Sequence, residues 1–274
     1  MESIFQLLAG NVRKEPVRID IAGTIESIAK IDKDLLYRCY NTFYNLNNMV
    51  IAVAGNFDVD KTLEICDELL KPSKDHGLQV IVPDEPLTVH EKRNVQKLSC
   101  AIPLFNIGWK FPAYSGKKQL EKYIVYNILM ELCLGKTSDF YNRMYEDGLL
   151  NDAFNVGVFC GRGFFSVIAD GESTDPDKVL SEIEKELFRL RKEGLDEDEF
   201  ITIRNKTYGE LVAGFNNVES VANAMIAQEI NDVGIYDGIE ITANTTFADI
   251  KSALDDFDIE NNSISIIELP MKIK

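Results

Sequence analysis

The chain of 274 residues is long enough for one large domain or two of ordinary size, and its 45% apolar and 27% charged residues are typical of a folded protein. Acidic residues (45) outnumber basic residues (29), and the formal net charge of −16 argues against a nucleic-acid partner, although it would suit a basic or extended peptide or simply give solubility. No stretch has the roughly 18 consecutive apolar residues of a membrane span, and the N-terminus lacks the basic region of a signal peptide, so we expect a cytoplasmic protein without membrane contact.

The cysteines are odd in number, widely spaced and without a C-x-x-C pair, which argues against both a disulfide framework and a zinc ribbon. Each lies within an apolar pattern. We therefore expect free, buried thiols in a reducing cytosol, at Cys39, Cys66, Cys100, Cys133 and Cys160.

The first part of the chain predicts two helices with an irregular stretch between them. Residues 2–13 resemble the end of a helix that lacks a cap of its own, so we expect the chain to be the C-terminal part of a longer protein. Pro16 and Gly23 bracket the irregular stretch. Asp32 can cap a helix over residues 33–45, whose apolar side chains recur at helical spacing and share one face: Leu35, Leu36, Cys39, Tyr40 and Phe43.

The run MVIAVAG, residues 49–55, lies between turn signals and contains β-branched residues, which predicts a buried strand. Asp58 can cap the helix that follows it. Residues 71–94 contain three prolines, several charges and no sustained period, and this pattern is typical of a linker.

Beyond residue 94, strand and helix patterns alternate. Gly161 and Gly163 flank an arginine in a turn between two apolar runs, and Asp175 followed by Pro176 is a favourable helix start. The predicted elements are a strand over 101–111, helices over about 116–134 and 138–147, two strands within 153–170, a helix from Pro176 to Gly194, a helix capped by Asp196 and Glu199, and a helix over about 218–230.

One arrangement occurs twice: a helix with a polar cap, an Asn-Asn turn and an apolar strand. Asp34 precedes Asn47 by 13 residues, and Asp249, in a helix that Thr245 or Thr246 can cap, precedes Asn261 by 12. This repeat predicts two related domains. We expect residues 1–70 to be the tail of the first domain, 71–94 the linker, and 95–274 the second domain.

The residues around the first copy carry a resemblance to a known family. The stretch from Glu15 to Asp58 resembles the end of the catalytic domain in the pitrilysin/insulinase family of zinc metallopeptidases, and it looks closest to the bacterial branch similar to processing proteases. GKTSDFYNRMYEDGLL, residues 135–150, is similar to part of the family's second, non-catalytic domain. The matching positions in the first segment are Pro16, Gly23, Tyr44, Asn48, Met49 and Gly55.

The resemblance implies an α+β fold made of repeated pitrilysin-type domains, each a mostly antiparallel sheet with helices packed on one face. It also implies that two halves close over an unfolded peptide substrate. The partner would be the missing catalytic domain or a partner subunit, and apolar surface left without that partner would favour a homo-oligomer.

Zinc in this family is held by His-x-x-Glu-His on one helix and by a further glutamate. His76 and His90 are the only histidines here, and both lie in the expected linker, too far apart for one helical turn. We therefore expect no metal ligand and no catalytic residue in this chain, inactivity when it is alone, and zinc in the full-length parent.

The family's second domain holds the substrate backbone with an arginine and a tyrosine on either side of a Gly-Leu turn. The corresponding positions here are Met144 and Asn151, while Arg143 and Tyr145 lie beside the expected arginine position. Arg143 and Tyr145 are therefore the candidate substrate-binding residues. The alternative is an arginine on a helix surface and a half-buried tyrosine.

Three functions remain open from the sequence. The first is the non-catalytic C-terminal portion of a zinc metalloendopeptidase, which forms one wall of a peptide-binding chamber. The second is a stand-alone binding or scaffold protein with the same fold. The third is an unrelated α/β enzyme, for which neither Gly161–Gly163 nor the single glycine at position 55 supplies a phosphate-binding motif.

Overall fold

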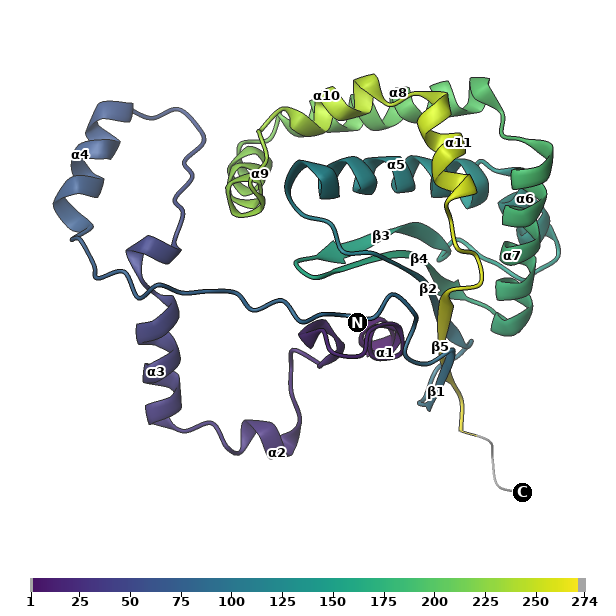
Figure 1. Ribbon diagram of the computed structural model, residues 1–274, viewed down its shortest axis with the longest axis horizontal. Coiled ribbons are helices and arrows are strands. Elements are labelled where there is room, and N and C mark those ends of the chain that lie inside the picture. The colour runs from purple at the N-terminus through teal and green to yellow at the C-terminus, as the bar shows by residue number, and fades with distance from the viewer. Residues whose placement is uncertain (1, 271–274) are drawn as a thin grey trace.

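The structure, a computed structural model, describes residues 2–270 and has an α+β fold around one five-stranded sheet (Figure 1). The strand order is β1-β5-β2-β4-β3, and only the β1–β5 pair is parallel. The mostly antiparallel sheet expected from the sequence is confirmed. The strands are β1 (Arg93–Lys97), β2 (Leu104–Phe111), β3 (Asn155–Gly161), β4 (Phe164–Glu172) and β5 (Asn262–Glu268).

A layer of helices covers one face of this sheet, with α5 directly on it and α8 and α10 packed outside α5 (Figure 1). Period-two alternation along β2 directs Phe105, Ile107 and Trp109 into the core under these helices. Trp109 is fully buried and donates its indole N–H to the carbonyl oxygen of Ile259 at 3.1 Å. The helices are α5 (Gly116–Leu134), α6 (Asp139–Glu146), α7 (Pro176–Glu193), α8 (Glu197–Gly214), α9 (Val218–Asn231), α10 (Asp237–Asn244) and α11 (Phe247–Asp255).

Helix α1 (Glu2–Asn11) covers part of the opposite face, in addition to the helix layer that the sequence predicted on one side. The side-chain amide of Asn11 donates to the carbonyl oxygen of Gly108 at 3.1 Å and accepts a bond from the Ser166 hydroxyl at 2.9 Å. A Cβ at Gly108 would lie 3.0 Å from Leu7, so the missing side chain lets the helix approach the strand. The N-terminal helix is thus tied to the sheet of the C-terminal part of the chain.

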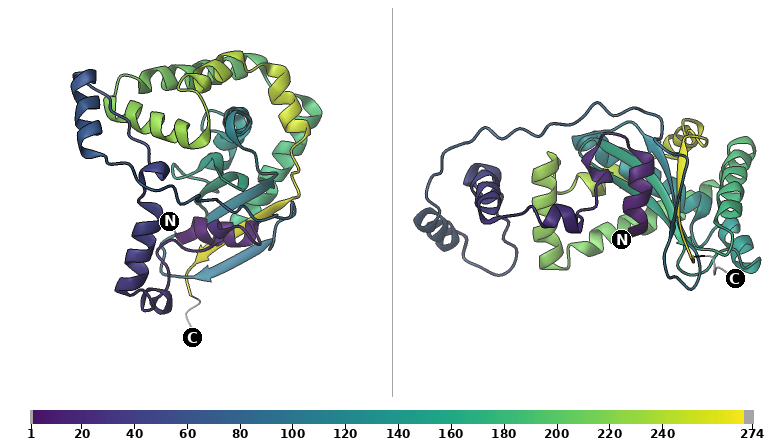
Figure 2. Two further views of the ribbon diagram at one scale, coloured as in Figure 1. Left: turned by 60° about the vertical axis from the view of Figure 1, so that its left-hand side comes forward. Right: turned by 90° about the horizontal axis from the view of Figure 1, so that it is seen from below.

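Residues 16–82, which we call the module, project away from the sheet (Figures 1 and 2). They form α2 (Ile25–Ile28), α3 (Lys33–Phe43), α4 (Val59–Leu69) and two short 3-10 turns at Pro16–Arg18 and Leu46–Asn48. Asp32 and Asp58 cap α3 and α4 as expected, but neither helix has a buried residue. The predicted helix thus forms, but its apolar face is exposed. The expectation that Cys39 is buried is wrong, because no described part of the chain packs on this face of α3.

The strand predicted at residues 49–55 does not form. Val50, Ile51 and Val53 are all exposed, and no strand of the described residues lies beside them to complete a hydrogen-bond ladder. At the C-terminal copy of the repeat, β5 is flanked by both β1 and β2. A strand needs such neighbours because its own backbone groups cannot pair within it.

Candidate functional site

Arg143, the first candidate for substrate binding, lies on α6, whose start is capped by Ser138 through a bond from the amide of Tyr141 at 3.1 Å. The Arg143 guanidinium is half exposed, and its Nη2 lies 2.8 Å from Oε2 of Glu186 on α7. Glu186 also binds Arg189 of its own helix at 2.6 Å. Two arginines thus converge on one carboxylate.

Glu186 is buried although it is charged, and its two arginine partners explain how. Burial by itself would raise the pKa of Glu186, but the hydrogen bonds and positive charges of Arg189 and Arg143 outweigh burial and lower it. Arg143 therefore holds α6 against α7 and still presents part of its guanidinium to solvent.

Tyr145, the second candidate, is half exposed and lies beside Tyr141, with 5.8 Å between ring centroids. The Tyr141 hydroxyl donates to Asp152 at 3.4 Å, and burial together with the Asp152 charge raises the pKa of Tyr141. Residues two positions apart on a helix do not face each other. The structure thus places Arg143 and Tyr145 on one helix, with different neighbours.

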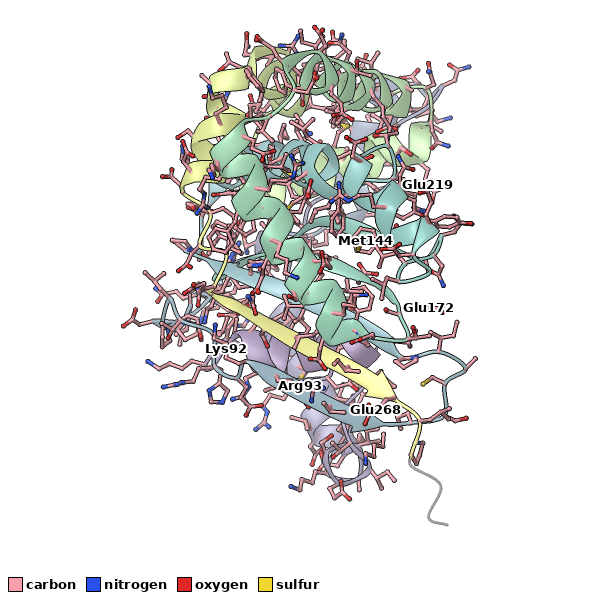
Figure 3. All side chains as sticks on the ribbon, turned by 90° about the vertical axis from the view of Figure 1, so that its right-hand side faces the viewer. Lys92, Arg93, Met144, Glu172, Glu219 and Glu268 are labelled. Atoms are coloured by element: carbon pink, nitrogen blue, oxygen red, sulfur yellow. The ribbon has the colours of Figure 1, made fainter. Side chains whose placement is uncertain are left out.

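The positions that match the family's arginine and tyrosine hold side chains with structural contacts. Met144 is buried in the core (Figure 3). The amide of Asn151 donates to Oε2 of Glu172, at the end of β4, at 3.0 Å. Neither side chain is a cation or a phenol that could hold a peptide backbone in the way expected of the family.

The part of the chain that the structure describes contains no group of three or more His, Cys, Asp or Glu side chains arranged to hold a metal ion. The Nδ1 atom of His90 accepts a bond from Nε of Arg13 at 3.3 Å. His76 lies in the extended stretch after α4. The donor set expected for family zinc is therefore not assembled from these residues, and they do not fit the ion.

The module carries a large unpartnered apolar surface. Most large apolar side chains that are exposed among the described residues lie within it, including Ile21, Ile25, Leu36, Phe43 and Leu69. Around α3, the side chains of Ile31, Leu36, Tyr37, Tyr40, Phe43 and Tyr44 line an open apolar groove of about 830 Å³. Monomeric proteins rarely expose large apolar side chains in such number on one segment.

The module leaves the sheet domain after residues 13–15 and re-enters it at residues 82–85. We call these two segments the neck, and Glu85 holds them together. The Glu85 carboxylate accepts bonds from the backbone N–H groups of Arg13 (2.7 Å), Lys14 (2.6 Å) and Glu15 (3.0 Å). It also pairs with Lys110 of β2 at 2.7 Å, and both charged side chains are buried. Burial by itself would raise the pKa of Glu85, but the amide bonds and the Lys110 ammonium lower it to about 2.

The turn between β3 and β4 closes against the same neck. Gly163 has a φ of +95°, and a Cβ there would lie 2.7 Å from both Oε2 of Glu15 and Cγ1 of Val82. Sequence reasoning missed Glu85 and Glu186, because a single acid in a linker or on a helix carries no signal of the distant groups that it binds.

Comparisons with known proteins agree with this architecture. The family profile described as "Peptidase M16 inactive domain" matches residues 30–207. An uncharacterized zinc protease of Bacillus subtilis (strain 168), YmfH, is 29% identical over 259 residues, which cover 91% of this chain and 59% of that protein. The chain spans only between 53% and 59% of the length of the curated relatives it matches.

Two solved structures show the same fold. The structure of an M16-like peptidase from Alicyclobacillus acidocaldarius matches with a TM-score of 0.90 and 26% identity, over 98% of this chain and 66% of that one. A protease from Helicobacter pylori matches with a TM-score of 0.81 and 14% identity, over 97% of this chain and 66% of that one. Within residues 2–270, no helix is both long and apolar enough to cross a bilayer. The profile match covers more than half of the chain, which therefore belongs to the M16 peptidase family and carries its inactive domain.

Proposed function

We propose that this chain is the non-catalytic portion of a zinc-dependent metalloendopeptidase of the pitrilysin/insulinase type and forms one wall of a peptide-binding chamber. The apolar surface of the module is the observation that carries the proposal. Exposed apolar area is unfavourable by about 25 cal/mol per Å², so a second folded body should cover it. We assign that role to the catalytic domain, which carries the His-x-x-Glu-His motif.

The domain division follows from this assignment. Residues 1–70 belong to the tail of the first domain, residues 71–94 link the domains, and residues 95–274 form the second domain. Helix α1 then crosses over to pack on the sheet of the second domain. The lengths of the curated relatives, which extend well beyond this chain, support a catalytic domain of that kind.

In this proposal the substrate is an unfolded peptide, and the protein acts in the cytoplasm. Arg143 and Tyr145 contact the substrate from α6, because each presents a half-exposed polar group beside the family's Gly-Leu turn. Zinc belongs to the catalytic domain. Without that domain, the module surface would drive self-association into a homo-oligomer.

The experiment combines the full chain with the catalytic domain encoded upstream or by a neighbouring gene. We expect chelator-sensitive hydrolysis of unfolded peptides only by the mixture with zinc, and none by either part alone. A catalytic domain whose motif glutamate is replaced by glutamine is the control. Hydrolysis by this chain alone that a chelator abolishes would contradict the proposal.

The substrate contact is tested in the same mixture. Arg143→Gln and Tyr145→Ser should raise the KM for peptide several-fold. Arg189→Gln is the matched control, because it also removes a partner of Glu186 but lies on α7. An equal change in KM for Arg143→Gln and Arg189→Gln would show that Arg143 acts only by holding α6.

One observation favours a second candidate, a stand-alone binding or scaffold protein. Met144 and Asn151 occupy the positions of the family's peptide-holding pair, and both are engaged in structural contacts. The open reading frame decides between the two. A His-x-x-Glu-His motif in the same gene or in an adjacent one supports the peptidase, and its absence from both supports the scaffold.

A further inference from the structure

A second unpartnered surface lies outside the module, on the helix layer. We call residues 208–236 the arm: they comprise the last two turns of α8, helix α9 and the turn that follows. Every residue from 208 to 220 is exposed, and α9 has no buried residue. The helix layer therefore ends in two helical segments that pack on little of the described chain.

The end of α8 presents an apolar stripe at helical spacing. Tyr208, Leu211, Val212 and Phe215 follow the i, i+3, i+4, i+7 pattern that normally faces a protein core, yet all four side chains are exposed. On α9, Val218 and Ile230 are more than half exposed. This pattern, together with its exposure, indicates a surface that another folded body covers.

The charge of the arm is entirely negative. It contains four acidic and no basic residues. None of the four acids forms an ion pair with a described residue. A segment that combines an apolar stripe with unpaired carboxylates fits a partner surface that has both apolar and basic side chains. The four acids are Glu210, Glu219, Glu229 and Asp232.

The position of the arm identifies the partner. Helix α9 lies at the end of the helix layer nearest to the module in each view (Figures 1 and 2). A folded body that packs on the module from the side of the helix layer would therefore also meet α9. We infer that the arm is a second docking surface for the catalytic domain, with a basic patch on that domain as its counterpart. This inference rests on the proposed function.

The test measures the Kd between the full chain and the catalytic domain. Glu219→Lys combined with Glu229→Lys should weaken association about tenfold or more at roughly 0.05 M salt, and the loss should shrink at roughly 0.5 M salt because charges are screened there. Asp255→Lys combined with Asp258→Lys, on the exposed surface of α11 and its C-terminal turn, is the matched control and should leave the Kd unchanged. Val218→Ser should weaken association at both salt concentrations.

The outcomes separate this inference from the proposed function. If the wild-type chain does not bind the catalytic domain at all, the proposed function fails. If module substitutions such as Leu36→Ala weaken binding while the arm substitutions leave the Kd unchanged, only the inference about the arm is overturned. If Glu219→Lys combined with Glu229→Lys leaves the Kd unchanged but raises the KM for a cationic peptide, the arm binds substrate. That result also overturns the inference that the arm docks the catalytic domain. Circular dichroism and thermal unfolding check that each variant is folded.

Discussion

Replacing leucine by alanine on two different helices distinguishes a side chain that is packed within this chain from one that a partner is expected to cover. Leu187 of α7 is fully buried, whereas Leu36 of α3 is 60% exposed. Replacing a buried leucine by alanine costs about 2–5 kcal/mol, because transfer energy is lost and a cavity remains. Leu187→Ala should therefore lower the unfolding free energy by that amount and the melting temperature by roughly 4–20 °C.

Leu36→Ala should change the unfolding free energy of this chain by only about 0.5 kcal/mol or less, as is usual for surface substitutions. Its effect should appear on association with the catalytic domain. Full burial of a leucine contributes about 1.5–3 kcal/mol, and because most of the side chain is still exposed, about 1–2 kcal/mol remains to be gained. This loss corresponds to a Kd raised about 5–30-fold.

Urea unfolding of the chain alone and calorimetric titration with the catalytic domain measure the two effects. If Leu36→Ala destabilises the isolated chain as much as Leu187→Ala does, Leu36 is packed within this chain and not kept for a partner. If the wild-type complex forms normally and Leu36→Ala leaves its Kd unchanged, the catalytic domain does not cover Leu36.

Three further predictions concern the neck and the N-terminal cap of α11. The pKa of Glu85 lies below its ordinary value, so the stabilisation that Glu85 gives is present above about pH 4.5 and is lost as the pH falls toward 2. Glu85→Gln should therefore flatten the curve of unfolding free energy against pH between these values. Parallel curves for the wild-type protein and the variant would contradict this prediction. Thr246→Ala removes the capping box of α11 and should cost about 1 kcal/mol in urea unfolding, so an unchanged midpoint would show that the cap contributes nothing. Gly163→Ala should destabilise the protein by about 1–3 kcal/mol, because φ at this position is positive and the added Cβ would clash at the neck. Gly209→Ala, in open space on α8, is the control and should be neutral or slightly stabilising. Equal shifts in melting temperature for the two variants would argue against close packing at the neck.

The helix starts could be predicted from the sequence because a cap involves groups only three residues apart. Each of four cap side chains accepts a hydrogen bond from the backbone N–H of the third residue after it, so the residues next to the helix start are enough to predict it. The four are Asp32, Asp175, Asp196 and Thr246. The hairpin around Gly163 is equally local. Helix α1, the helices beyond residue 115 except α10, and the strands except β1 followed from such patterns and from apolar periodicity.

Partners far apart in the chain decided the rest. Residues 49–55 and 262–268 are both apolar runs after Asn-Asn, yet only the second forms a strand, because only there do β1 and β2 supply backbone groups for its hydrogen bonds. Glu85 binds amides about 70 residues away, and Glu186 binds Arg143 43 residues away. The local sequence sets the propensity of a segment to form a helix or a strand. Whether a strand forms depends on hydrogen-bond partners that come together only when the chain folds, and residues 49–55 of the module have none among the described residues.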